Sequence, residues 1–90
     1  MSDWTWEYVP DADSVVGGLT KTQIDEAENV AVRIADAVAV RRIGTPFDIR
    51  ESVSSVKSHG EGPVMIWFLE DYRENVILVV RVQHLGHALT

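Results

Sequence analysis

The chain contains no cysteine, which excludes a disulfide framework and any metal site built on thiolates. No stretch approaches the roughly 20 apolar residues that a transmembrane helix requires. Met1–Pro10 lacks the basic start and the apolar run of a signal peptide. We therefore expect a cytoplasmic protein that makes no contact with a membrane.

Two common catalytic motifs are also missing. Gly17-Gly18 and Gly60-Glu61-Gly62 lack the strand, loop and helix context of a phosphate-binding loop. The serines between positions 52 and 58 belong to a predicted strand and have no nucleophile elbow around them. The sequence thus predicts neither a nucleotide-binding loop nor a serine hydrolase, and we expect no cofactor and no bound metal.

Basic residues are scarce, with 8 Lys and Arg against 14 Asp and Glu and a net charge of −6. A chain of this charge is repelled by a nucleic-acid backbone, which argues against non-specific binding to nucleic acid. The imbalance lies in residues 1–40, whereas residues 41–90 hold equal numbers of acidic and basic groups. Any local basic cleft must therefore come from the second half of the chain.

The chain does have two apolar runs of strand length, Val64–Leu69 and Val76–Val82, rich in Val, Ile, Phe and Trp. The segment between them, Glu70–Asn75, has the polarity of a hairpin loop. This pattern predicts an antiparallel hairpin at the centre of the core.

The N-terminal part predicts a short strand and a short helix. Aromatic residues at every second position predict a strand whose aromatic face packs on a helix: Trp4, Trp6 and Tyr8. Pro10 ends this strand. Asp11 or Asp13 is expected to cap a short helical turn, which Gly17-Gly18 ends.

A long amphipathic helix is predicted at about Lys21–Arg42. Thr20 and Gln23 form a capping-box pattern at its start. Its apolar stripe has helical spacing and is rich in small residues: Ile24, Ala27, Ala31, Ile34 and Val38. Arg41-Arg42 either complements the helix dipole or borders an anion-binding patch.

Arg50–His59 alternates weakly and predicts a polar strand, followed by a flexible turn at His59–Pro63 and, after the hairpin, by a tail from Gln83. The fold class is therefore α+β: an N-terminal strand, a short helix, a long amphipathic helix and a three-stranded antiparallel meander. The length of 90 residues predicts a single domain spanning residues 1–90.

This order of elements resembles the RelE/ParE superfamily of toxins from type II toxin–antitoxin systems. The segment Val76–Gly86 is similar to the last strand of that family, with Arg81 and His84 near its end, and Trp67-Phe68 resembles an aromatic of the preceding strand. The chain departs from the family in its acidity, in Pro63-Val64 where an arginine is usual, and in the missing C-terminal tyrosine.

The resemblance implies a toxin that binds an antitoxin protein and acts either on ribosome-bound mRNA, as a metal-independent endoribonuclease, or on another target without chemistry. It makes His84 the candidate acid or base and Arg81 the candidate phosphate clamp. Glu51 is the candidate base on the preceding strand. Substrate binding would fall to Arg50, Lys57 and His59 on or beside that strand.

The alternative is a non-catalytic domain that keeps the fold and works as a homodimer or a partner-binding module. Arg81 and His84 are three positions apart, so an ideal strand points them to opposite faces unless a bulge intervenes. Arg81 would then share the face of Ile77 and Val79 and pair with Glu7 or Glu51. A zinc site made from three histidines, His59, His84 and His87, is a weaker possibility.

Overall fold

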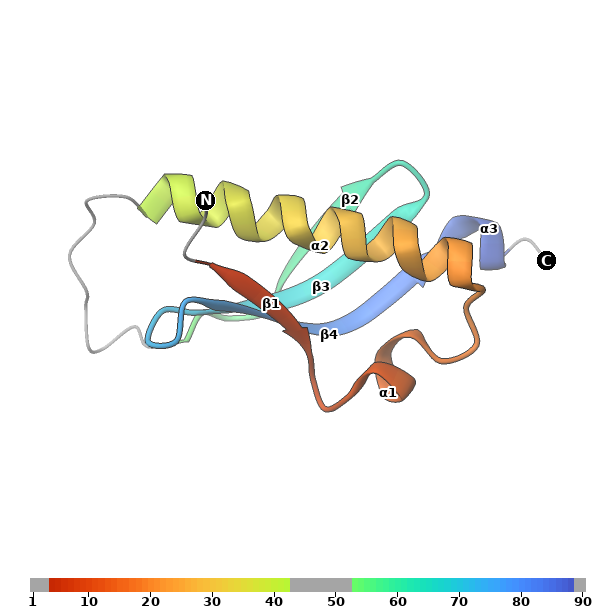
Figure 1. The fold of residues 1–90 in the computed structure, drawn as a ribbon, viewed down its shortest axis with the longest axis horizontal. Coiled ribbons are helices and arrows are strands. Elements are labelled where there is room, and N and C mark those ends of the chain that lie inside the picture. Colours follow the sequence, from red (N-terminus) through yellow and green to blue (C-terminus); the bar gives the residue numbers. More distant parts are fainter. Residues whose placement is uncertain (1–3, 43–52, 89–90) are drawn as a thin grey trace.

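The computed structural model describes residues 4–42 and 53–88, which form an α+β fold, as predicted. In chain order the elements are β1 (Thr5–Tyr8), α1 (Ala12–Val16), α2 (Lys21–Arg42), β2 (Lys57–Glu61), β3 (Val64–Asp71), β4 (Val76–His84) and α3 (Leu85–Ala88). Figure 1 shows α2 lying along one face of the sheet.

The strands form one sheet in the order β1-β4-β3-β2. β2, β3 and β4 pair antiparallel, which confirms the predicted meander, and β1 adds to β4 in parallel. The meander turns back at Gly62 and Asn75, whose φ angles of 57° and 54° lie in the left-handed region. β2 therefore forms one edge of the described sheet, and β1 forms the other.

The long helix has the predicted bounds because its local signals are strong. Thr20 and Gln23 form the capping box reciprocally: the Gln23 amide donates to Thr20 Oγ1 at 3.2 Å, and the Thr20 amide donates to Gln23 Oε1 at 3.0 Å. The small side chains of Ala27, Ala31 and Ala35 are buried, so the helix approaches the sheet closely.

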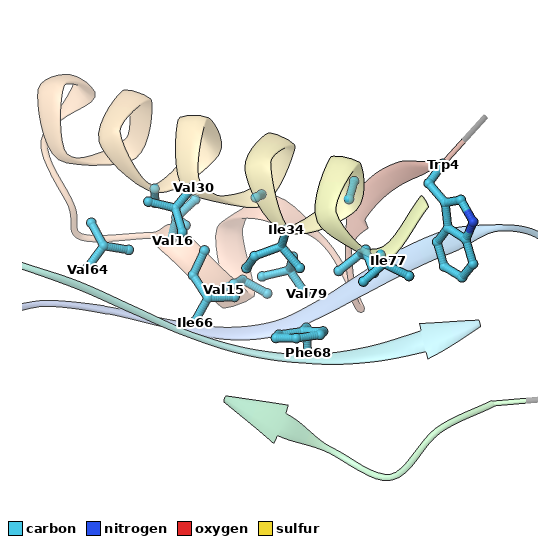
Figure 2. Packing of buried hydrophobic residues seen from close by; sticks show 14 residues of the cluster. Trp4, Val15, Val16, Val30, Ile34, Val64, Ile66, Phe68, Ile77 and Val79 are labelled. Atoms are coloured by element: carbon cyan, nitrogen blue, oxygen red, sulfur yellow. The ribbon is translucent and has the colours of Figure 1, made fainter. Parts of the chain in front are cut away.

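The core lies between α2 and the inner face of the sheet (Figure 2). Ile66 of β3 and Ile77 and Val79 of β4 are fully buried there. Trp6 and Tyr8 of β1 pack against the edge of this cluster, as the alternation of aromatics predicted. Burial of the strand side chains against one helix is the main source of stability in this fold.

A bulge in β4 changes which side chains share a face of the sheet. Trp67 pairs with Arg81, whereas the next residue, Phe68, pairs with Val79, so Val80 is the extra residue. Val79 and Val82 both pack on the core side as a result. Arg81 therefore lies on the outer face, and the prediction that it shares the face of Ile77 and Val79 was wrong.

Two predicted boundaries also differ. Residues 50–52 of the predicted polar strand lie outside the described residues. Of the rest, Val53 makes only an isolated bridge to Asp71, and the continuous strand begins at Lys57. The strand runs past His59 to Glu61, which pairs with Val64 around Gly62, so the turn is tighter than predicted.

Residues 83–88 of the predicted tail form regular secondary structure. β4 continues to His84, and α3 follows directly. The Leu85 amide donates to the Pro63 carbonyl at 2.7 Å, which ties this end of the chain to the start of β3.

Candidate functional site

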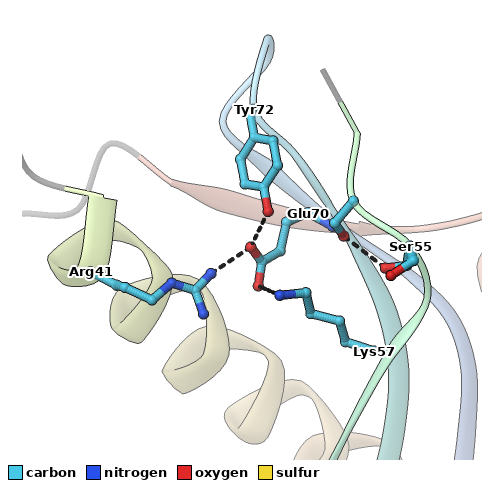
Figure 3. A network of polar contacts seen from close by, with 6 residues as sticks. Arg41, Ser55, Lys57, Glu70 and Tyr72 are labelled. Carbon is cyan, nitrogen blue, oxygen red and sulfur yellow. Dashed lines mark hydrogen bonds and ion pairs between the residues drawn. The ribbon is translucent and has the colours of Figure 1, made fainter. Parts of the chain in front are cut away.

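A buried carboxylate, Glu70, lies where α2, β2 and β3 meet (Figure 3). Its side chain is only 1% exposed, and its Oε1 atom accepts hydrogen bonds from the Arg41 guanidinium and from the Tyr72 hydroxyl, the latter at 2.8 Å. Lys57 Nζ lies 3.7 Å from its Oε2 atom. A buried charge requires this kind of compensation, because an unpaired carboxylate in the interior is strongly unfavourable.

The pKa of Glu70 reflects this balance. Desolvation by burial acts to raise the pKa, but the hydrogen bonds from Arg41 and Tyr72 and the positive charges of Arg41 and Lys57 outweigh it. The pKa of Glu70 is therefore lowered from its ordinary value, and the group is ionised at neutral pH. It is suited to organise cations and unsuited to act as a general base near neutrality.

The backbone around Glu70 is fixed from a second direction. The Glu70 amide donates to Ser54 Oγ at 2.8 Å, and the Ser54 amide donates to the Glu70 carbonyl at 2.9 Å. The Ser54 hydroxyl in turn donates to the Ser55 carbonyl at 2.8 Å. Ser54 thus holds the segment before β2 against β3 and helps to position Lys57.

A groove of about 530 Å³ opens beside this network between α2 and β2, and we call it the α2–β2 groove. Its apolar lining includes Ile34, Val38 and Phe68, and its cationic lining includes Arg33, Arg41 and Lys57. Two of these cations make their contacts with Glu70 yet stay accessible, since Arg41 is 54% and Lys57 41% exposed. The groove therefore offers cations to solvent, whereas its deepest carboxylate is covered.

The other end of the groove carries a second ionic cluster. Arg33 pairs with Glu61 at 2.6 Å, and His59 Nε2 lies 3.3 Å from the same carboxylate. The hydrogen bond from Arg33 is the main reason that the pKa of Glu61 is lowered, and His59 adds to the effect. The groove thus brings together two of the residues predicted to bind substrate, Lys57 and His59.

His84 lies elsewhere, at the end of β4 beside the first turns of α2. It is buried, its Nε2 atom is 3.0 Å from Glu26 Oε2, and its Nδ1 atom accepts from the Gly86 amide at 3.0 Å. Because a backbone amide only donates, Nδ1 is unprotonated and Nε2 donates to Glu26. Both ring nitrogens are occupied, so this arrangement leaves neither of them open to a substrate.

Arg81 lies on the opposite face of the sheet from His84. Its guanidinium carbon is 4.9 Å from the centre of the Trp67 ring, in a cation–π contact across the strand pair. The bulge precedes Arg81, so it does not bring Arg81 and His84 onto one face. The expected catalytic pair is thus separated by the sheet, and the other two candidates, Arg50 and Glu51, lie outside the described residues.

The residues that organise the groove were largely missed from the sequence. Glu70 was assigned to the hairpin loop, although it continues the alternation of Ile66 and Phe68 on the inner face of β3. That alternation was the available signal for its burial. Arg41 was expected either to complement the helix dipole or to border an anion-binding patch. Its contact with Glu70 is long-range and left no local signal.

Among the side chains that the structure describes, no group of three or more His, Cys, Asp and Glu residues is placed to hold a metal ion. Of the three histidines considered for zinc, His87 has its side chain outside that described part. No helix in the described part of the chain is both long and apolar enough to cross a membrane. Comparison with protein-family models, with curated proteins and with solved structures finds no match to this chain.

Proposed function

We propose that this chain is a non-catalytic domain that binds a protein partner in the α2–β2 groove. The observation that carries the proposal is the separation of Arg81 from His84 on opposite faces of the sheet, with both nitrogens of His84 occupied. General acid–base cleavage of RNA requires such groups to converge on one phosphate. The groove, in contrast, combines an apolar surface with accessible cations, which is suited to recognition.

The chemistry of the groove defines the segment that it would bind. Its accessible cations favour acidic side chains, and its apolar lining favours aliphatic ones. β2 is an edge of the sheet, and among the described residues no strand pairs with its outer side, which suits it to pair with an extended strand. The proposed partner segment is therefore extended, with acidic and aliphatic residues. If the resemblance to RelE/ParE toxins reflects kinship, that partner is an antitoxin.

A defined peptide tests this proposal. A soluble peptide of alternating valine and glutamate, titrated into labelled protein, is expected to shift the amide resonances of β2 and of the C-terminal half of α2. Arg33→Glu should weaken this binding at least about tenfold, because it reverses a charge at the groove. Arg73→Glu makes the same change in the exposed β3–β4 turn and is the control.

The same peptide with lysine in place of glutamate should produce no shifts. Equal binding of the two peptides, or equal effects of Arg33→Glu and Arg73→Glu, would contradict the assignment of the groove. Shifts confined to residues outside β2 and α2 would also contradict it.

A second candidate function is the endoribonuclease that the RelE/ParE resemblance implies. One observation favours it: Lys57 and His59 lie in the same groove as Arg33 and Arg41, where several cationic groups meet. Such a nuclease would cleave mRNA in a translating extract, and His59→Ala would abolish cleavage whereas Arg73→Ala would not. Absence of cleavage by the purified protein, together with normal growth of cells that express it, would exclude this function.

A further inference from the structure

The face of the sheet opposite α2 carries an apolar surface on its two central strands. Alternation along β3 and β4 directs these side chains outward, and we call them the open face: Met65, Trp67, Leu69, Leu78 and Val80. Within the described residues, α1 and α2 lie on the other side of the sheet (Figures 1 and 2). The uncovered face of an antiparallel sheet ordinarily carries polar residues, so an apolar stripe here calls for an explanation.

The two edge strands border this stripe with polar or small residues. On β1, Trp6 and Tyr8 pack against the core, so Thr5 and Glu7 are directed outward. On β2, Ser58 and Gly60 are the neighbours of the outward residues of β3. An apolar centre within a polar rim is the pattern of a protein–protein interface.

We propose that the open face binds a second copy of this chain, face to face, around a two-fold axis that crosses the strands. The charges of the face support this occupant because they complement themselves. Glu7 lies level with Leu78 in the sheet, and Arg81 lies further along β4, level with Trp67. A two-fold axis midway between these levels exchanges them, so Arg81 of each copy meets Glu7 of the other.

Other occupants fit the face less well. The chain carries a net charge of −6, and Arg81 is the single cation on the outward positions of the described strands, so a nucleic-acid strand would gain little electrostatic attraction there. Trp67, whose ring is already ordered by Arg81, provides the kind of aromatic anchor found at the centre of interfaces. The two edge strands have only 4 and 5 residues, so the face buries an area at the small end of specific interfaces, and we expect a dissociation constant on the order of micromolar rather than a permanent dimer.

Sedimentation equilibrium of the full chain, from low micromolar to near-millimolar concentration, tests this dimer. Glu7→Arg and Arg81→Glu are each expected to weaken association at least about tenfold, because each places like charges opposite one another. The double variant restores the pair with its charges exchanged, so its association should return to within a few-fold of the original. Arg73→Glu is the control for charge alone, and circular dichroism verifies that each variant is folded.

A protein that stays monomeric over the whole range would overturn the proposal. A dimer that neither single variant weakens, or that the double variant fails to restore, would overturn this arrangement. The test is independent of the groove: binding of the acidic peptide should be the same in Arg81→Glu as in the original chain. If the original chain dimerises but does not bind the acidic peptide, the proposed function of the groove fails and the proposed dimer stands.

Discussion

The replacement Glu70→Gln removes the one buried negative charge that Arg41, Lys57 and Tyr72 share. Glutamine has nearly the shape of glutamate, so the packing around the side chain is preserved. Its carbonyl oxygen can stay in the place of Oε1 and accept from Arg41 and Tyr72. Its amide nitrogen then takes the place of Oε2 and faces Lys57, where two donors meet instead of an ion pair.

The expected cost follows from these contacts. The bond from Tyr72 changes from one with a charged partner, worth about 1.5–3 kcal/mol, to a neutral one worth about 1 kcal/mol, so it loses about 1 kcal/mol. The bond from Arg41 keeps its charged guanidinium and loses only the attraction of the ion pair, up to about 1 kcal/mol. The exposure of Arg41, at 54%, places its contribution at the low end. Removal of the desolvation cost of a carboxylate offsets part of the loss. The net destabilisation is about 1–2 kcal/mol, which lowers the melting temperature by roughly 4–15 °C in a domain of this size.

The difference between the two proteins should depend on pH. The pKa of Glu70 is lower in the folded state than in the unfolded state, so its charge stabilises the fold above the unfolded value, about 4.3 for glutamate. This stabilisation is lost as the pH falls through the lowered pKa of the folded state. The melting temperatures of the original chain and of Glu70→Gln are therefore well separated at pH 7 and converge in acid.

Calorimetry or circular dichroism measures the melting temperatures of both proteins between pH 2 and pH 8. This range extends to both sides of pH 4, about where carboxyl groups titrate. Glu74→Gln, an exposed carboxamide replacement in the following turn, is the matched control and should change stability by less than about 0.5 kcal/mol. Equal stability of Glu70→Gln and the original chain at pH 7, or a difference that persists undiminished in acid, would refute the role assigned to Glu70.

Two further predictions concern the turn before β3 and the N-terminal strand. Gly62→Ala should destabilise the protein by about 1 kcal/mol because its φ of +57° disfavours a side chain. Gly60→Ala should cost less, because the closest atoms to its new methyl group belong to the flexible end of Met65. Chemical denaturation compares the two variants. Tyr8 donates to Glu28 at 2.8 Å, and burial, followed by this hydrogen bond and the charge of Glu28, raises the pKa of Tyr8. The protonated Tyr8 hydroxyl contributes fully to stability below the ordinary tyrosine pKa of about 10, and this contribution is lost as the pH rises toward the raised pKa of the folded state. The difference in melting temperature between the original chain and Tyr8→Phe should therefore be smaller at alkaline pH than at neutral pH.

The parts of the fold that were predicted correctly are those with local signals. The capping box of Thr20 and Gln23 and the small-residue stripe defined α2, because both depend only on neighbours within a few positions. The hairpin of β3 and β4 was equally clear from its two apolar runs. Its strands extend beyond the predicted ends, to Asp71 and His84, because pairing in the sheet continues through polar residues.

The register of the sheet was not predictable in the same way. β2 has few apolar side chains to fix its register, so its bounds were wrong at both ends. The bulge at Val80 contains no glycine or other local signal. It nevertheless directs the side chains after it to the opposite faces from those that strict alternation along β4 predicts. Arg81 follows the bulge, so the face of the sheet on which it lies was predicted incorrectly. The separation of Arg81 from His84 depends only on the residues after the bulge and was predicted correctly.

The network around Glu70 illustrates the same limit for the site. Arg41 comes from the end of α2 and Lys57 from the start of β2, so the contacts with Glu70 exist only after the sheet and helix have packed together. Sequence spacing carries no information about such contacts. The alternation that places Glu70 inward was readable, but a charged residue after an apolar run is more often the start of a loop.

The two proposed interaction surfaces lie on opposite sides of one sheet. The α2–β2 groove is lined by α2 and lies on the helix side of the sheet, whereas the open face is on the other side, so a face-to-face dimer would leave both grooves accessible and directed away from the interface. Such a dimer would present two equivalent grooves to a partner that itself carries two binding segments. The second contact would then form at a high effective concentration, so a groove with modest affinity for a single segment would still support a tight assembly. The weak dimer and the groove thus reinforce each other, although the five apolar residues of the open face lie outside the lining of the groove.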